Sequence, residues 1–200
     1  MLAPWAAVPL EPRFELEDVL IEADLSGASA AGGRLTGCRL SGVSLARARL
    51  RSLRLVDVVL SDCDLSNADL TGATLRRARF ERCRMTGLVG ASWEATQVAL
   101  RGCKLDLVSF HRGVFRGVEF EDCVLDDADL AASWLRETRF ASSRLRRVAI
   151  DDARLAGVDF RGSVLEPAGD VTALRGAVID ALQLVELAPL LARGLGIEVR

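Results

Sequence analysis

The 200-residue sequence lacks the residue sets on which most enzymatic chemistry depends. It contains one histidine, His111, and its five cysteines form no Cys-x-x-Cys pair, so neither a zinc cluster nor a serine–histidine–aspartate triad is expected. A phosphate-binding glycine loop is also missing. The acidic pairs Asp126–Asp127 and Asp151–Asp152 are interpreted as solvated turn residues rather than as a general acid and base. We therefore expect a protein that is not an enzyme, with no catalytic, cofactor-binding or metal-binding residues.

Long hydrophobic runs are absent too, although half of the residues are apolar. No run is long enough to span a bilayer. Residues 1–9 have neither a basic lead-in nor an uninterrupted apolar stretch, so a signal peptide is not expected. We expect one domain in the cytoplasm, without membrane contact and with reduced cysteines.

The sequence repeats one pattern of residues with a period of five. In the stretch 68–78, a small residue is followed two places later by leucine, and mostly polar residues separate each leucine from the next small residue. Centres of this kind fall at every fifth position from Leu20 to Leu165, and 27 of the 30 are Leu, Phe, Met or Ile. Residues two apart on an extended chain point to the same side, so each unit predicts a short strand followed by a corner. Repeated units of this kind stack into a β-solenoid.

A second period of twenty residues indicates four sides per coil, because a three-sided coil would repeat every fifteen. The residues that recur at this spacing are Cys63, Cys83, Cys103 and Cys123, and also Phe80, Phe120, Phe140 and Phe160. Each cysteine, including Cys38, occupies the small position of its unit, where Ala and Val stand elsewhere. We therefore predict buried, reduced thiols rather than disulfides or metal ligands.

Three segments carry a resemblance to a known family: 23–27 (Ala-Asp-Leu-Ser-Gly), 67–70 (Asn-Ala-Asp-Leu) and 128–130 (Ala-Asp-Leu). On these and the other repeats of residues 18–165, the chain resembles the pentapeptide-repeat proteins. The resemblance implies an all-β fold, a right-handed quadrilateral β-helix with a C-terminal helical cap. The overall layout is similar to the Qnr-type, gyrase-protecting immunity branch, whose members dimerise through their C-terminal ends and imitate duplex DNA with an acidic rod. DNA gyrase, or another topoisomerase, is therefore implied as a candidate protein partner.

The segments outside the repeat are predicted to close the solenoid, since an open end would expose strand edges and core. Residues 1–17 are interpreted as an N-terminal cap, and residues 166–200 as a last partial coil followed by a helix that begins after the N-cap Asp180. The apolar residues predicted to cover the first coil are Trp5, Leu10, Phe14 and Leu16.

Residues 86–97 weaken the repeat, because the centres Gly90 and Ala95 are small and Trp93 stands where a small residue belongs. Two interpretations remain open. Trp93 fills the space that the small centres leave, or the segment forms an outward loop that a partner reads.

The C-terminal helix is predicted to be apolar on two sides. One face, with Leu182 and Val185, is expected to seal the last coil. The second face, formed by Leu184, Leu187 and Leu191, is then expected to form a homodimer interface. The alternative is that both faces pack on the last coil of a monomer.

The surface charges point to one side of the coil, the side with centres from Leu35 to Leu155. It carries three acids and seven arginines: Arg34, Arg54, Arg76, Arg77, Arg116, Arg136 and Arg154. Trp134 is expected to be exposed on the same side, and an exposed Trp beside Arg is typical of protein interfaces. The candidate interaction residues are therefore Arg116, Trp134, Arg136 and Arg154.

Direct nucleic-acid binding is not expected at a net charge of −2, and no side carries the continuous acidic face that DNA mimicry requires. The predicted function is a non-enzymatic protein-binding module, with DNA gyrase or another topoisomerase as a candidate partner. The alternative is a structural or scaffolding solenoid with no connection to topoisomerases or nucleic acid.

Overall fold

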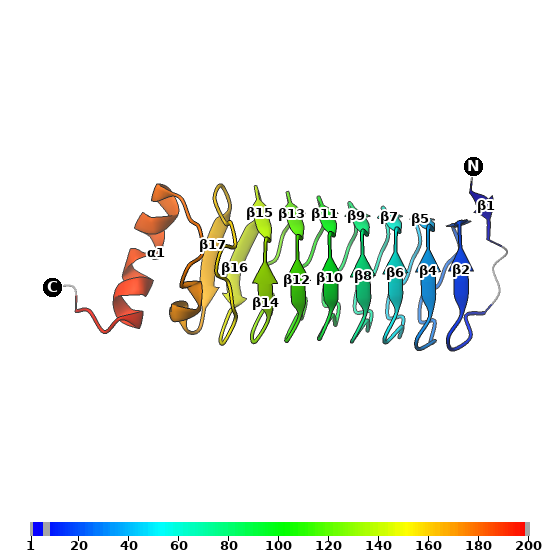
Figure 1. Cartoon of the computed structure of the whole chain (residues 1–200), viewed down its shortest axis with the longest axis horizontal. Coiled ribbons are helices and arrows are strands. Elements are labelled where there is room, and N and C mark those ends of the chain that lie inside the picture. Colours follow the sequence, from blue (N-terminus) through cyan, green and yellow to red (C-terminus); the bar gives the residue numbers. More distant parts are fainter. Residues whose placement is uncertain (1, 6–8, 199–200) are drawn as a thin grey trace.

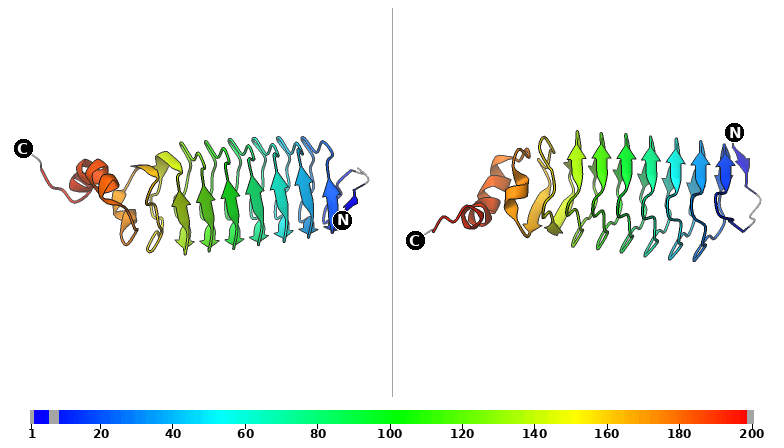
Figure 2. Two further views of the ribbon diagram at one scale, coloured as in Figure 1. Left: turned by 90° about the horizontal axis from the view of Figure 1, so that it is seen from above. Right: turned by 60° about the horizontal axis from the view of Figure 1, so that its bottom comes forward.

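The chain forms a parallel β-solenoid of about eight turns, closed at one end by a single helix (Figure 1). The computed structural model describes residues 2–5 and 9–198. Strands of successive coils lie side by side along the rod, with the two ends of the chain at opposite ends of it (Figure 2). The predicted solenoid with a C-terminal helical cap is confirmed.

Two sheets of very short strands form two of the four sides. The first contains β1 (Ala3–Pro4), β3 (Val19–Ile21), β5 (Arg39–Ser41), β7 (Val59–Ser61), β9 (Arg79–Glu81), β11 (Ala99–Arg101), β13 (Glu119–Glu121) and β15 (Arg139–Ala141). The second contains β2 (Glu15–Glu17), β4 (Arg34–Thr36), β6 (Arg54–Val56), β8 (Thr74–Arg76), β10 (Glu94–Thr96), β12 (Val114–Arg116) and β14 (Trp134–Arg136).

The remaining two sides are joined mainly by isolated parallel bridges. The third side includes the bridge Ser44–Asp64, and the fourth side runs through Ser29, Arg49 and Asp69. Near the C-terminal end, β16 (Arg144–Ala149) pairs with β17 (Val164–Ala168). Register partners in both main sheets lie twenty residues apart from β4 onward, which confirms four units per coil.

The corner between two sides is made by the residue two places after each centre, which takes a left-handed backbone conformation. Asp57 (φ 57°) and Leu107 (φ 59°) are examples. A left-handed non-glycine residue costs about 1 kcal/mol or more. The corner amides offset this cost by donating to the next coil, as from Leu107 N to the Asp126 carbonyl at 2.9 Å.

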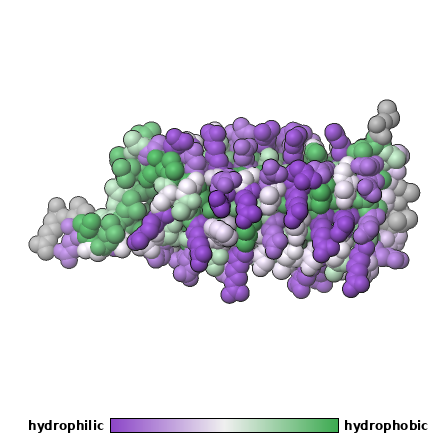
Figure 3. Space-filling view, viewed as in Figure 1, coloured by the Kyte–Doolittle hydropathy of each residue, from purple (hydrophilic) through white to green (hydrophobic). Residues whose placement is uncertain are grey.

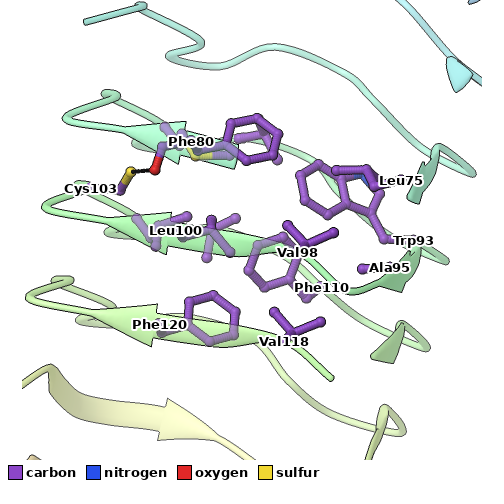
Figure 4. Packing of buried hydrophobic residues seen from close by; sticks show 14 of the residues in the cluster. Leu75, Phe80, Trp93, Ala95, Val98, Leu100, Cys103, Phe110, Val118 and Phe120 are labelled. Atoms are coloured by element: carbon purple, nitrogen blue, oxygen red, sulfur yellow. Dashed lines mark hydrogen bonds between the residues drawn. The ribbon is translucent and has the colours of Figure 1, made fainter. Parts of the chain in front are cut away.

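The irregular segment 86–97 is repacked inside the solenoid. The Trp93 side chain is 1% exposed, and its ring centroid lies 5.0 Å from that of Phe110 (Figure 4). Its indole N–H donates to the Leu70 carbonyl at 3.0 Å. A Cβ added at Gly90 would lie 2.9 Å from atoms of both rings, so the small centre makes the room that Trp93 fills. The strand β10 keeps its register with β8 and β12. The repacking interpretation is confirmed, and the outward loop is wrong.

All five cysteines are buried and free, as predicted. Four of them belong to a longer polar column whose side chains donate to the carbonyl 23 residues earlier. Cys103 Sγ donates to the Phe80 carbonyl at 3.5 Å (Figure 4), and Gln183 Nε2 donates to the Phe160 carbonyl at 2.6 Å. The column contains Cys63, Cys83, Cys103, Cys123, Ser143, Ser163 and Gln183. Hydrogen bonding with the neighbouring thiol, together with burial, raises the pKa of Cys83 and Cys103 to about 12.

The N-terminal segment caps the rod but also contributes strands. β1 and β2 lie before residue 18, so both sheets begin earlier than the predicted repeat. Leu16 stacks against Leu35, and Ile21 against Leu40, at a spacing of nineteen residues. The residue equivalent to the centre Leu40 is therefore Ile21, which is 1% exposed, and the prediction of Leu20 as a centre is wrong. The predicted covering residues do pack against the core: Trp5, Leu10, Phe14 and Leu16.

The C-terminal end follows the last coil through a 3₁₀ helix (Val171–Leu174) into α1 (Ala181–Gly194). Asp180 is the N-cap, and its carboxylate accepts from Leu182 N and Gln183 N, as the predicted capping box requires. Its other oxygen accepts from Gly162 N at 3.0 Å, which ties the cap to the last coil. In the described part of the chain, no helix has the length and apolar character needed to cross a membrane.

The faces of α1 differ from the prediction at three of its residues. Leu187 is 1% exposed and packs on the core, whereas Leu182 and Val185 are 78% and 71% exposed. Leu191 is partly buried, and Leu184 is 52% exposed. The rotation of the helix about its axis causes this difference. Hydrogen bonds of Asp180 and Gln183 with the last coil fix that rotation. The prediction of Leu187 as an exposed interface residue is wrong.

Candidate interaction surfaces

The four predicted interaction residues form one cluster on the second sheet. Arg116 on β12 is in register with Arg136 on β14, and Trp134 on β14 is bridged to Arg154. Trp134 and Arg136 are two residues apart on one strand, so their side chains share a face. All four are exposed, with Trp134 at 42%. We call this cluster the Trp134 surface.

The charge of the Trp134 surface is only partly compensated. Arg136 Nε lies 3.4 Å from the Glu137 carboxylate, but Arg116 and Arg154 form no ion pair with any residue that the structure describes. Val114, 36% exposed, is in register with Trp134 and widens its apolar centre. The surface thus combines an exposed ring with guanidinium groups that are available to carboxylates.

The predicted arginine side is not one continuous stripe. Between Arg76 and Arg116 the register position is Thr96, and Arg77 is held by Asp57 at 2.6 Å. The exposed basic residues therefore form two groups, one near each end of the rod.

Many of the remaining ion pairs run along the rod, between neighbouring coils. Arg77–Asp57, Arg82–Asp62 and Arg147–Asp127 join residues twenty apart, each with a bidentate contact. The hydrogen bond from Arg147 lowers the pKa of Asp127, and Arg144 pairs with Asp126 at 2.8 Å. The acidic pair Asp126–Asp127 thus links two neighbouring coils through ion pairs and does not form an isolated acidic patch.

The other polar residues singled out in the sequence have structural contacts. His111 Nδ1 lies 3.7 Å from the Asp129 carboxylate, which also accepts from Ser109 Oγ at 3.2 Å. Asp151 accepts from Asp170 N at 2.8 Å and holds the last turn. Among residues 2–5 and 9–198, no group of three or more His, Cys, Asp or Glu side chains could hold a metal ion.

The C-terminal end carries the most concentrated exposed apolar surface in the view of Figure 3, over α1 and the segment after it. Hydrophilic residues dominate the rest of that face. We call this area the C-terminal apolar patch; its residues are Leu182, Leu184, Val185, Leu195 and Ile197.

The repeats identify the family. The family model of pentapeptide repeats matches residues 19–52, 54–87 and 123–162 with eight copies, and the chain belongs to this family. The unmatched interval between residues 87 and 123 contains Gly90 and Ala95, where the centres are small. No curated protein matches the chain.

The chain aligns over most of its length with two solved structures, QnrB1 and HetL. QnrB1, a plasmid-mediated fluoroquinolone resistance protein, is 20% identical, with 93% of this chain and 92% of that chain covered and a TM-score of 0.45. HetL, a pentapeptide-repeat protein involved in heterocyst differentiation regulation from the cyanobacterium Nostoc sp. strain PCC 7120, is 18% identical, with 84% and 90% covered and a TM-score of 0.44.

Proposed function

We propose that this pentapeptide-repeat protein is a non-catalytic, cytoplasmic protein-binding rod that uses the Trp134 surface to bind an acidic surface of a partner protein. The observation that supports this is the exposed Trp134 between Arg116 and Arg154, for which the described residues provide no carboxylate partner. Exposed Trp and Arg residues are the types that most often dominate protein interfaces. Unpaired guanidinium groups around the ring would steer an acidic partner and fix its orientation.

DNA gyrase is the first partner to test, because the layout resembles the gyrase-protecting branch of the family. The mode of binding would differ from DNA mimicry. The acids Asp57, Asp62 and Asp127 are already bound to arginines of the next coil, so a continuous acidic face is not available to replace DNA phosphates.

The test is a pull-down of gyrase with the full chain, together with a supercoiling assay. Trp134→Ala should weaken an interaction at this surface by about 2 kcal/mol or more, roughly thirtyfold in Kd. The double variant Arg116→Glu/Arg136→Glu should weaken binding and reduce its salt dependence. Arg79→Glu/Arg84→Glu is the matched control, because these arginines are also exposed and form no ion pair within the described chain.

Equal losses in the test and control variants would show that only overall charge matters and would contradict the Trp134 surface. If gyrase does not bind, the same variants are applied to partners captured from a lysate. A partner that is indifferent to all three substitutions would favour the alternative, a structural solenoid.

The C-terminal apolar patch supports a second part of the proposal, a homodimer through the C-terminal end. Leu182 and Val185 are three residues apart on α1 and more than two-thirds exposed, and the patch lies where the coils end. A twofold contact between two such ends would cover both patches. The core side of α1 is already occupied by Leu187, so the patch is the face left for a second copy.

Light scattering at micromolar concentration tests the dimer. The wild-type chain should have twice the monomer mass, and Leu182→Glu/Val185→Glu should give a monomer with an unchanged circular dichroism spectrum. Leu107→Glu, at an exposed leucine far from α1, should remain dimeric. A monomeric wild-type chain would refute the dimer, and a dimer that survives the double substitution would place the contact elsewhere.

A further inference from the structure

A band of uncompensated positive charge surrounds the second coil. Residues 25–56 contain six arginines and no aspartate or glutamate. All six side chains are exposed: Arg34, Arg39, Arg47, Arg49, Arg51 and Arg54. Within the part of the chain that the structure describes, only Arg51 forms an ion pair, with Asp69 at 2.6 Å.

The acids of the following coil do not neutralise this band. Asp57 is bound to Arg77, and Asp62 to Arg82, both through two hydrogen bonds to the coil on the far side. Asp64 accepts hydrogen bonds from Ser66 of its own coil, and Asp69 turns back toward the band, where its carboxylate accepts from Arg51 Nε at 2.6 Å. The positive charge of the arginines in this band is therefore available to an external anion.

The preceding coil is acidic on three sides but neutral on the fourth. Glu15 and Glu17 lie on the second sheet, Glu22 follows β3, and Asp24 lies on the third side. Residues 26–33, which form the fourth side of this coil, are Ser-Gly-Ala-Ser-Ala-Ala-Gly-Gly. An anion can thus approach the band over this small, uncharged strip without meeting a carboxylate of the same coil.

Ser29 and Ala31 of this strip, together with Arg49, Arg51 and Asp69 of the next two coils, line a shallow hollow of about 510 Å³. Arg13 lies beside the strip on the side away from Arg49 and Arg51. Its backbone N–H donates to the Ala31 carbonyl at 2.8 Å, and its Cγ lies 3.5 Å from where a Cβ on Gly32 would be. Arg13 on one side of the strip and Arg49 and Arg51 on the other are two coils apart, about 10 Å at the usual strand spacing. We call this site the arginine shelf.

We propose that the arginine shelf binds an extended, acidic peptide segment of a partner protein. The distance between Arg13 and the pair Arg49 and Arg51 suits one extended chain, whose alternate side chains reach both sides of the strip. Guanidinium groups bind carboxylates through two parallel hydrogen bonds, and 25 of the 26 basic residues of this protein are arginine. The site lies on the fourth side and shares no residue with the Trp134 surface.

A peptide fits the arginine shelf better than a nucleic acid does. Single-stranded nucleic acid is held largely by stacking on aromatic rings, and Trp134 is the one large exposed aromatic side chain in residues 2–5 and 9–198. It lies on another side, several coils away. A long phosphate backbone that followed the rod would also meet Asp69 directly beyond Arg49, with which it is bridged.

The test is fluorescence anisotropy with the full chain and a fluorescein-labelled peptide of six glutamates that alternate with serine. The peptide should bind at low salt, and Arg13→Glu/Arg49→Glu should weaken binding by about tenfold, as the loss of two exposed ion pairs implies. Arg79→Glu/Arg84→Glu is the matched control, because both arginines are exposed and have no ion pair within the described chain. It changes the net charge equally and should leave affinity within about twofold, since Arg79 lies on the first sheet and Arg84 on the third side, away from the fourth side.

Ala31→Trp distinguishes the contribution of the hollow's shape from that of its charge, because it places an indole in the hollow and leaves every arginine unchanged. It should abolish most of the peptide binding while the circular dichroism spectrum and the melting temperature stay unchanged. Equal losses in the two charge variants, or full binding by Ala31→Trp, would overturn the proposal. Tighter binding of a single-stranded oligonucleotide of equal charge would overturn the assignment to a peptide. An absence of binding to either probe would overturn the site itself.

Discussion

The stack of Phe120, Phe140 and Phe160 gives the sharpest test of the core. Phe140 is fully buried, and its ring lies 4.6 Å from that of Phe120 and 5.0 Å from that of Phe160, with interplanar angles of 7° and 5°. Truncation of a buried phenylalanine to alanine costs about 3–5 kcal/mol. Each stacked contact adds about 0.5–1.5 kcal/mol to the burial term.

The expected loss for Phe140→Ala lies at the upper end of this range, about 4–5 kcal/mol, because the cavity cannot close. Phe140 is held in register with Phe120 between β13 and β15, and its amide donates to the Asp159 carbonyl of the next coil. These ladders keep the coils at their spacing, so the neighbouring rings cannot move into the space. Both stacked contacts are lost at once.

Urea unfolding followed by far-UV circular dichroism measures this loss, with Phe140→Leu as the matched variant. Leucine fills part of the volume and is the commonest centre, so Phe140→Leu should cost only about 1–2 kcal/mol. A loss below about 1 kcal/mol for Phe140→Ala would refute the rigid, stacked core. Equal losses in the two variants would show that the cavity does not determine the cost.

Three further predictions address the cap, the corners and the acid dependence. Gln183→Leu should leave the Ser163 carbonyl without its donor and the Phe160 carbonyl with the Ser163 N–H alone, cost about 2 kcal/mol and raise amide exchange in α1 first. Uniform exchange along the chain would contradict this prediction. Leu107→Asn should stabilise the chain by about 1 kcal/mol in urea, because Asn tolerates the left-handed corner, whereas Val89→Asn on an extended segment should not. The hydrogen bond from Arg161 lowers the pKa of Asp159 to about 2, below the unfolded value of about 3.9, so its contribution is full above pH 4 and is lost as the pH falls toward 2. Asp159→Asn should therefore flatten the stability curve between pH 4 and pH 2, and an unchanged curve would exclude this role.

The four-sided coil could be predicted because a parallel ladder forces equivalent positions to stack. Once Cys63, Cys83 and Cys103 recur every twenty residues, the register follows, since a slip would turn every inward side chain outward. The same rule placed Arg116 beside Arg136 and Trp134 beside Arg154. The twenty-residue spacing alone therefore predicted that the residues of the Trp134 surface are neighbours.

The sequence predictions were wrong where the repeat gives no information about the phase of the first coil or the rotation of α1. Leu20 and Ile21 are both apolar, so composition could not show that the first coil is one residue short. In α1, leucines stand on every side, and the apolar pattern could not choose the buried face. The useful signal was Gln183, a polar residue twenty positions after Ser163, which continues the buried column and fixes the helix.

The distribution of ion pairs explains why a count of the charges on each side of the coil identified only one of the two candidate surfaces. An arginine such as Arg77, twenty residues after Asp57, or Arg147, twenty residues after Asp127, is occupied by the coil before it. Its charge stabilises the stack and is not available to a partner. Binding surfaces are then expected where this axial pairing fails, and among the described residues it fails most clearly at Arg116 and Arg154, and around Arg49. The first group surrounds an exposed Trp and the second borders a neutral hollow, so the two surfaces should select partners of different shape.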